Sequence, residues 1–314
     1  MAEEVNPLDA MTLGSEPRWV RALGEPAAAV TVPVQLAAAL EKLRAEIRLG
    51  EGTRARLFRP IRGPRRIRLP ERVVGDTSAR ILLTRDGSVA YARRSNQVGV
   101  EDLVLCHPMR DFSRRHGQSN KPVAYYSRTV GDLVACESQH ERRFALLADW
   151  HPLVLHIASQ PFTVEFPPAH SLDSHTPDFV LLSKSGAVVV VDVKWPSAAL
   201  DPEVVRRHDE VRRVLAGQGM QHVVWDSAPT SVTQNLANFA AARVPEAMLI
   251  ATSTKLLEVF HPGIRVETLL QVSAERFALQ PMSALVAVRR MLWDHRFKID
   301  MSVPFGMQTR LFIP

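Results

Sequence analysis

One segment constrains the fold more than any other: the run AVVVVDVKW at residues 187–195, which is almost entirely apolar and β-branched. β-branched side chains favour strands, and a strand that is apolar on both faces is typical of a sheet covered on both sides. The turn sequence KSG separates this run from PDFVLLS at residues 177–183, so the two strands are expected to pair antiparallel. The sequence therefore predicts a fold built around a buried β-hairpin.

The surrounding segments alternate between helical and strand patterns. Helices are predicted at residues 36–49, 138–149 and 201–219, and strands at residues 160–166 and 222–226. A further hairpin is predicted over residues 80–92, around the turn Asp86-Gly87. This order of elements predicts an α/β fold, a mixed sheet flanked by helices.

The length of 314 residues allows more than one domain. We assign residues 1–76 to an N-terminal extension, 77–228 to the α/β domain and 229–314 to a mostly helical C-terminal domain. Within the last, residues 283–296 and the closing hairpin fit a winged-helix element. Its expected core positions are Leu285, Val288, Leu292 and Trp293.

Charge and cysteine usage narrow the class of protein. The 39 Lys and Arg residues against 33 Asp and Glu give a net charge of +6, which favours a polyanionic partner only weakly. Neither Cys106 nor Cys136 lies in a CxxC or Cys/His motif, so we expect neither a zinc site nor a disulfide framework. The N-terminus lacks a signal-peptide core, and no stretch reaches 18 apolar residues, which predicts a cytoplasmic protein.

Three charged side chains interrupt the buried hairpin. Asp178 stands near the start of one strand and Asp192 near the end of the other, so antiparallel pairing brings both carboxylates to one end of the sheet. Lys194 follows Asp192 by two residues and therefore points to the same face. Neighbouring carboxylates repel one another unless a cation lies between them, and their oxygen ligands suit Mg²⁺ or Mn²⁺. Such an ion activates water and polarises a phosphodiester, while the ammonium group offsets charge in the transition state.

The helix before these strands also carries acids. Glu137 and Glu141 are four residues apart and share one helix face. One of them is expected to complete the metal site, and the other to pair in solvent with Arg142 or Arg143. The alternative is that the whole set arises by chance, because an acid, any residue and a lysine recur about once or twice in a chain of this composition.

The pattern ESxxE, QPF, PDF and DVK resembles the PD-(D/E)xK nuclease superfamily. Within it, ESQHERRFALLADWHPLVLHIASQPF is similar to the TnsA-type transposase endonuclease subunits, as are MRDFSRRHGQSNKPVAYYSRT and NLANFAAAR. The resemblance covers residues 80–243, extends loosely into the C-terminal region and does not include residues 1–76. It implies a restriction-endonuclease-like core in a bacterial cytoplasmic protein. It also implies divalent-metal cleavage of DNA at transposon ends, beside a DDE-type transposase and an AAA+ regulator.

Carried over residue by residue, the resemblance implies a catalytic set of four, namely Glu141, Asp178, Asp192 and Lys194. The metal ligands it implies are Glu141, Asp178, Asp192 and Val193. Gln160 matches a family glutamine, and a structural role at the start of a strand is equally compatible with it. Glu141 occupies the matching helix position, but the sequence leaves open whether Glu137 or Glu141 faces the metal.

Residues 54–72 hold eight arginines and one acid, broken by prolines that disfavour a helix, so an extended arm is expected. Such an arm can follow DNA phosphates, and a solvated tail or a clamp on a partner protein is equally compatible with it. The DNA-contacting candidates are the basic residues of this arm and of the segment before the acidic helix: Arg54, Arg56, Arg59, Arg62, Arg65, Arg66, Arg68, Arg114 and Arg115.

Three functions remain open from the sequence. The first is a Mg²⁺-dependent DNA endonuclease of the TnsA type, which cuts one strand at a transposon end. The second is a stand-alone restriction or repair nuclease on the same core. The third is a non-catalytic DNA-binding or assembly subunit whose acids are structural.

Overall fold

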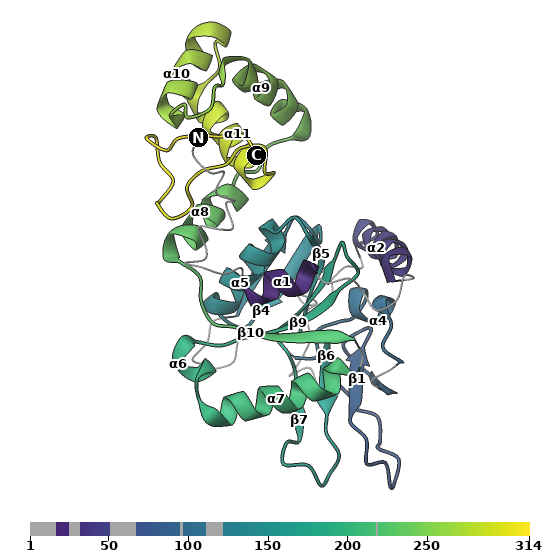
Figure 1. Ribbon diagram of the computed structural model, residues 1–314. Coiled ribbons are helices and arrows are strands. Elements are labelled where there is room, and N and C mark those ends of the chain that lie inside the picture. Colours follow the sequence, from purple (N-terminus) through teal and green to yellow (C-terminus); the bar gives the residue numbers. More distant parts are fainter. Residues whose placement is uncertain (1–16, 25–31, 51–66, 95–96, 111–121, 218) are drawn as a thin grey trace. The chain divides into compact units, whose positions relative to one another are not determined.

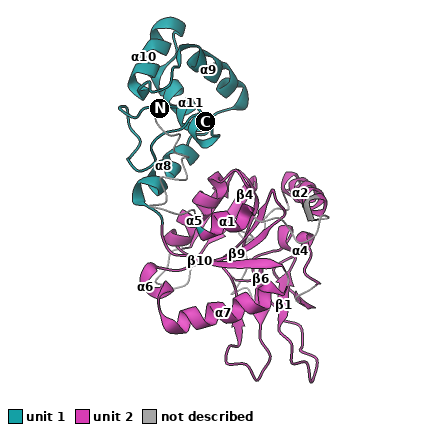
Figure 2. Ribbon diagram, viewed as in Figure 1, with its two compact units in different colours: residues 1–17, 228–314 teal, residues 18–227 magenta. Residues whose placement is uncertain are grey.

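The computed structural model describes the chain except for residues 1–16, 25–31, 51–66, 95–96, 111–121 and 218. It divides into two compact units, one made of residues 18–227 and the other including residues 228–314 (Figure 2). The boundary expected from the sequence lies between residues 228 and 229. The first two described helices belong to the larger unit, although they were expected in an N-terminal extension.

The larger unit is built on a four-stranded mixed sheet in the order β10-β9-β8-β5. Strand β9 pairs parallel with β10 and antiparallel with β8, and β8 pairs antiparallel with β5. The strands of this sheet are β5 (Val154–Ser159), β8 (Phe179–Ser183), β9 (Val188–Val193) and β10 (Met220–Trp225). The valine run therefore lies inside the sheet, and its side chains from residue 189 to 193 are buried, as the sequence predicts.

A tight turn closes the β8–β9 hairpin. The main-chain N–H of Ser183 donates to the carbonyl of Ala187, and Gly186 has a φ of 85°. Glycine adopts this left-handed conformation without the steric penalty that a Cβ atom would bring. The turn fixes the register in which Phe179 lies opposite Val191.

A second sheet, in the order β2-β1-β6-β7, packs in the same unit. Its strands are β1 (Arg80–Thr84), β2 (Ala90–Arg94), β6 (Phe162–Glu165) and β7 (Ser174–His175). The predicted hairpin around Asp86-Gly87 is confirmed, since β1 and β2 pair antiparallel. One expectation is wrong: the strand predicted at residues 160–166, which is β6, belongs to this second sheet and not to the mixed sheet. In the mixed sheet, β8 pairs on one side with β9 and on the other with β5, a strand that was not predicted from the sequence.

Helices cover the mixed sheet on both faces (Figure 1). On one face lie α1 (Arg18–Gly24) and α5 (Gln139–Trp150), where Phe144 packs on Phe179 and Trp225. The opposite face meets α7 (Pro202–Ala216), and its core also contains residues of the second sheet. The shorter α4 and α6 and the longer α2 complete the helices of this unit: α2 (Val32–Arg48), α4 (Val100–Val104) and α6 (Pro196–Ala199). The larger unit is therefore a mixed α/β structure whose central sheet is flanked by helices, as the sequence predicts.

A buried acid anchors a separate hairpin, β3 (Val123–Ser127) with β4 (Asp132–Cys136), to the end of α5. The Asp149 carboxylate accepts hydrogen bonds from the hydroxyls of Tyr125 and Ser127, each at 2.6 Å. It also accepts from the main-chain N–H groups of Arg128 and Thr129 at 3.0 and 2.8 Å. Burial, followed by the nearby Asp149 charge, raises the pKa of Tyr125, so this hydroxyl stays a donor.

Replacing Asp149 with alanine is expected to lower the free energy of unfolding by about 3–5 kcal/mol, because two buried hydroxyl donors and two part-buried main-chain donors lose their acceptor. Urea unfolding followed by circular dichroism measures the change. Asp209→Ala is the control, since Asp209 lies on the exposed surface of α7 in an ion pair with Arg212. Equal midpoints for the two variants would contradict an anchoring role for Asp149.

The smaller unit is helical, with α8 (Thr230–Ala240), α9 (Glu246–Val259), α10 (Val266–Phe277) and α11 (Pro281–Trp293). Helix α11 contacts the other three, and its residues Val288, Leu292 and Trp293 are buried, as expected, while Leu285 is half-buried. The closing residues make isolated bridges, Lys298 with Phe312 and Arg265 with Arg310. The structure describes all of residues 228–314 and assigns them no regular strand, so the expected hairpin is reduced to these bridges.

None of the helices in the described part of the chain is both long enough and apolar enough to cross a membrane.

Candidate active site

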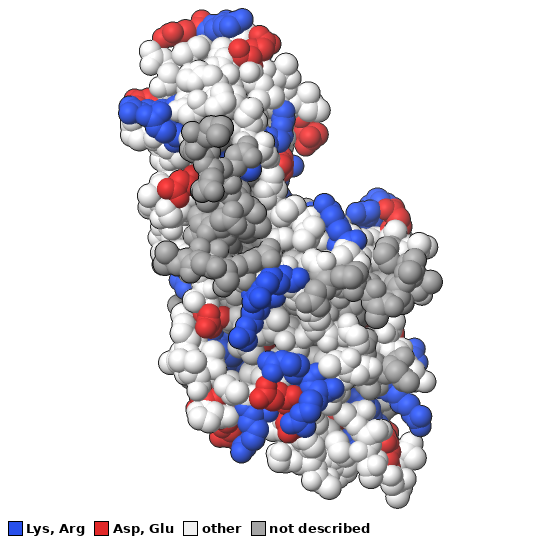
Figure 3. Space-filling view, in the orientation of Figure 1, with Lys and Arg blue, Asp and Glu red and all other residues white. Residues whose placement is uncertain are grey.

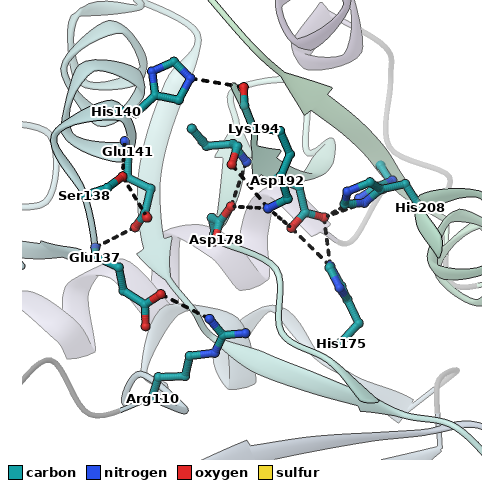
Figure 4. Close-up of polar contacts among 12 residues, drawn as sticks. Arg110, Glu137, Ser138, His140, Glu141, His175, Asp178, Asp192, Lys194 and His208 are labelled. Atoms are coloured by element: carbon teal, nitrogen blue, oxygen red, sulfur yellow. Dashed lines mark hydrogen bonds and ion pairs between the residues drawn. The ribbon is translucent and has the colours of Figure 1, made fainter. Parts of the chain in front are cut away.

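The structure brings Asp178, Asp192 and Lys194 together at one end of the β8–β9 hairpin (Figure 4). Extending the register of Phe179 with Val191 by one residue puts Asp178 opposite Asp192. The Lys194 ammonium lies 3.4 Å from Asp178 Oδ2 and 3.8 Å from Asp192 Oδ1. The convergence expected from the spacing of these residues is therefore present.

Main-chain contacts hold this corner in place. The N–H of Val193 donates to Asp178 Oδ2 at 2.7 Å, and the Lys194 ammonium donates to the carbonyl of Val193 at 3.2 Å. The N–H of Lys194 donates to the carbonyl of Trp225 on β10. Asp178 is therefore fixed by β9, and the first residue after β9 is fixed by β10.

Glu141 approaches the site from α5. Its side chain is 7% exposed and accepts hydrogen bonds from the Glu137 N–H at 2.7 Å and the Ser138 hydroxyl at 3.1 Å. Ser138 is the N-cap of α5 and in turn accepts from the Glu141 N–H. A reciprocal pairing of Ser and Glu three residues apart is a common helix start. Glu141 therefore takes part in the N-terminal cap of α5 and also interacts electrostatically with Asp178.

The charges at this corner are not balanced. Burial, followed by the charge of Asp178, raises the pKa of Glu141 to about 8. Burial, followed by the charge of Asp192, also raises the pKa of Asp178, although Lys194 opposes it. Burial would lower the pKa of Lys194, but the two aspartates outweigh burial and raise it. Three acids around one ammonium form a site with spare negative charge, which a cation would neutralise.

The stability of the protein without added divalent metal is expected to fall with rising pH because of Glu141. The pKa of Glu141 is about 8 in the folded protein, against an ordinary value of 4.5. The contribution of the protonated carboxyl group to the free energy of unfolding is therefore complete below about pH 4.5 and is lost as the pH rises through about 8. Glu141→Gln keeps the cap but cannot ionise. As the pH rises from about 5 to 9, the free energy of unfolding of Glu141→Gln, measured with urea, should increase by about 2–4 kcal/mol relative to that of the wild type. Parallel stability curves for the two proteins would contradict a buried, uncompensated acid.

The other candidates on this side of the site have different partners. Glu137 pairs with Arg110, whose Nη1 lies 3.1 Å from Glu137 Oε2. Glu141, whose pKa responds to Asp178, is therefore the glutamate that belongs to the acidic corner. Gln160 is fully buried with a φ of 45°, and its N–H donates to the Asp178 carbonyl while its own carbonyl accepts from Met109. Its main chain thus positions the Pro-Asp segment.

Two aromatic rings, those of Trp195 and His140, lie beside Lys194. Trp195 stacks on His140 with ring centroids 4.0 Å apart, and His140 Nε2 lies 3.1 Å from the Lys194 carbonyl. Trp195 nevertheless remains 56% exposed. The residue after the lysine is therefore partly packed and partly open to solvent.

The structure also surrounds Asp192 with three histidines that were not predicted from the sequence. Asp192 Oδ2 lies 2.7 Å from His222 Nε2, 2.9 Å from His175 Nε2 and 3.3 Å from His208 Nδ1. Burial alone would raise the pKa of Asp192, but the charge and hydrogen bonds of the neighbouring histidines, His175 first, hold it well below its usual range. We call these four residues the His/Asp cluster. Their ligand atoms all lie within 4.8 Å of one another, and the cluster could bind a metal.

The expectation against a zinc site took into account only local Cys/His motifs, and the His/Asp cluster is not of that kind. The members of the His/Asp cluster come from β7, β9, α7 and β10, so they are spread over four elements and no short motif marks them. A weaker signal was available: His208 shares the buried face of its helix with Val211 and Leu215. A polar ring at a core position of an amphipathic helix requires a partner.

Most of the DNA-contacting candidates lie outside the described residues. This applies to Arg54, Arg56, Arg59, Arg62, Arg65, Arg66, Arg114 and Arg115. Arg68 is described and exposed, and its main chain forms a bridge with Val89. Arg72 is half-buried and pairs with Glu165 at 3.1 Å, so this arginine has a structural role. Figure 3 shows Lys and Arg side chains on both units, several of them beside Asp or Glu.

Comparison of the sequence with protein-family models and with curated proteins finds no match.

Proposed function

We propose that this protein is a divalent-metal-dependent DNA endonuclease with a restriction-endonuclease-like core, similar to the TnsA subunits of heteromeric transposases. In this proposal Glu141, Asp178, Asp192 and Lys194 form the active site, and water attacks one phosphodiester at a transposon end. A DDE-type transposase and an AAA+ regulator are the proposed partners. The resemblance of the ESxxE, PDF and DVK segments supports the family, and the geometry supports the chemistry.

One observation carries the proposal: the Lys194 ammonium lies within 4 Å of two carboxylates, at 3.4 Å from Asp178 and 3.8 Å from Asp192. A rigid hairpin holds all three groups, and Glu141 adds a further acid. Metal-dependent sites that hydrolyse phosphodiesters use acids to hold the metal and a cation to offset charge, and this corner supplies both.

The donor set fits Mg²⁺ or Mn²⁺ in this proposal. The candidate ligands are the carboxylates of Glu141, Asp178 and Asp192 and the main-chain carbonyl of Val193, all oxygen donors of the kind these ions prefer. The raised pKa values of Glu141 and Asp178 agree, because a bound cation would offset both the burial and the repulsion between acids that raise them. Such an ion, when bound, would acidify a water molecule and polarise the phosphodiester.

Two basic side chains, those of Lys194 and Arg110, have separate roles in this proposal. The Lys194 ammonium is held by Asp178 on one side and can orient a water or offset charge on the pentacovalent phosphorus. Arg110 has a half-exposed side chain, and its charge lowers the pKa of Asp178. It is therefore a candidate to contact a DNA phosphate, and breaking its pair with Glu137 would free it to do so.

The test is nicking of supercoiled plasmid DNA with Mg²⁺ or Mn²⁺, by the chain alone and with a partner transposase. Asp178→Asn is expected to abolish nicking while DNA binding, measured by gel shift, stays within a few-fold of wild type. Wild-type protein that binds DNA but never nicks it, under either condition, would contradict the proposal. A wild-type protein that cuts without any partner, at sites unrelated to transposon ends, would favour the stand-alone nuclease.

A non-catalytic DNA-binding or assembly subunit is the second candidate, and a specific observation favours it. Glu141 caps α5 and Asp192 faces three histidines, so two of the four acidic-site residues already have structural partners. In that case the acids would stabilise the fold, and Asp178→Asn would change stability without any activity to lose. The nicking assay separates the two candidates directly.

A further inference from the structure

We propose that the His/Asp cluster is a zinc site, with Zn²⁺ held by His175 Nε2, His208 Nδ1, His222 Nε2 and a carboxylate oxygen of Asp192. This inference goes beyond the proposed nuclease function and does not depend on it. The site lies on the face of β9 that meets α7, whereas the acidic corner lies at the end of the β8–β9 hairpin (Figure 4).

The spacing of the donors fits a four-ligand ion. Tetrahedral Zn²⁺ with bonds of about 2.0–2.1 Å separates its donor atoms by about 3.3 Å. The three histidine nitrogens lie 2.7, 2.9 and 3.3 Å from Asp192 Oδ2, and all four donors lie within 4.8 Å of one another. These separations are close to those around a tetrahedral Zn²⁺ ion.

The hydrogen bonding of the cluster is incomplete without a ligand. His208 Nε2 and His222 Nδ1 have no hydrogen-bond partner among the described residues, although both atoms are buried, and His208 Nδ1 makes only the 3.3 Å contact with Asp192 Oδ2. His208 and His222 are 2% and 6% exposed. A buried ring nitrogen without a hydrogen-bond partner carries a desolvation cost. A metal ion that takes the lone pair of His208 Nδ1 removes part of that cost.

The ligand chemistry points to zinc rather than to magnesium. Imidazole nitrogens suit Zn²⁺ and other late first-row metals, whereas Mg²⁺ prefers oxygen ligands and keeps several waters. All four residues are buried, and closed four-ligand sites are characteristic of structural zinc.

The four ligands join parts of the fold that are separate in the chain. His175 belongs to β7 of the second sheet, Asp192 and His222 to β9 and β10 of the mixed sheet, and His208 to α7. A bound ion would therefore tie both sheets and a covering helix together. Asp192 stands between the two sites, since Oδ2 faces the histidines and Oδ1 lies 3.8 Å from the Lys194 ammonium.

Metal analysis of the full-length protein, purified without a histidine tag or chelator, tests the proposal. We expect about one zinc ion per chain by plasma mass spectrometry, as a four-ligand site predicts. Removing the zinc and adding Co²⁺ should give the intense visible absorption of tetrahedral cobalt bound to nitrogen and oxygen, and Zn²⁺ should abolish it. The His208→Gln variant should lose at least nine-tenths of the metal.

Two variants serve as matched controls. His156→Gln removes another buried histidine, which lies on β5 outside the cluster, and should keep its zinc. Asp178→Asn alters the acidic corner alone and should also keep its zinc, so loss of nicking and loss of zinc are separable. Wild-type protein that contains no zinc and gives no cobalt band after metal addition overturns the proposal. So does metal that is lost in Asp178→Asn but kept in His208→Gln.

Discussion

Replacing Lys194 with methionine is expected to lower the rate of Mg²⁺-dependent DNA nicking by about three orders of magnitude or more, the scale of losing a preorganised charge in an active site. Methionine keeps most of the apolar stem but removes the ammonium, which lies 3.4 Å from Asp178 and 3.8 Å from Asp192. A preorganised charge in a partly buried site contributes far more to the transition state than one in water. Plasmid nicking under single-turnover conditions measures the loss.

The stability of the Lys194→Met protein should change little, because the ammonium is half-buried and its removal leaves acids that can protonate. Lys184→Met is the matched control: Lys184 is exposed at the opposite end of the same hairpin, and this variant should nick at the wild-type rate. A Lys194→Met protein that nicks within about ten-fold of wild type would refute the assigned role. Loss of DNA binding in the same variant would reassign the lysine to binding.

Asp192→Asn is expected to have the largest effect on stability of the changes at either site. The substitution keeps the shape of the side chain but removes the negative charge that three buried histidines share, at 2.7, 2.9 and 3.3 Å. Removing one partner from a buried charged cluster costs about 3–5 kcal/mol of unfolding free energy. The midpoint of urea unfolding should fall accordingly, with a loss of bound zinc and of nicking.

Asp178→Asn provides the comparison for that result. Asp178 and Asp192 are both buried and lie opposite one another, but only Asp192 faces the histidines. Asp178→Asn should therefore unfold at a urea concentration close to that of the wild type and keep its zinc. Equal destabilisation by the two substitutions would show that the histidines do not depend on Asp192.

The central hairpin and the acidic corner follow from sequence patterns because both depend on local spacing. A two-residue separation in a strand puts Asp192 and Lys194 on one face, and a short turn brings Asp178 opposite Asp192. The helix that carries Glu141, predicted at residues 138–149, spans Gln139–Trp150. By contrast, β5 pairs with β8, and β6 belongs to the second sheet. Both pairings depend on contacts between residues distant in the chain, which local sequence patterns do not predict.

The sequence by itself determined the buried β9 strand, the positions of its neighbours β8 and β10, and the meeting of two acids with a lysine. Only the tertiary structure decided that Glu141 rather than Glu137 belongs to that corner, because a cap at Ser138 and an ion pair with Arg110 set their directions. It also decided that three histidines surround Asp192. Their elements are distant in the chain and meet only when two sheets and a helix pack, so no short motif marks the cluster, and His208 at a core position of its helix is a weak signal of it.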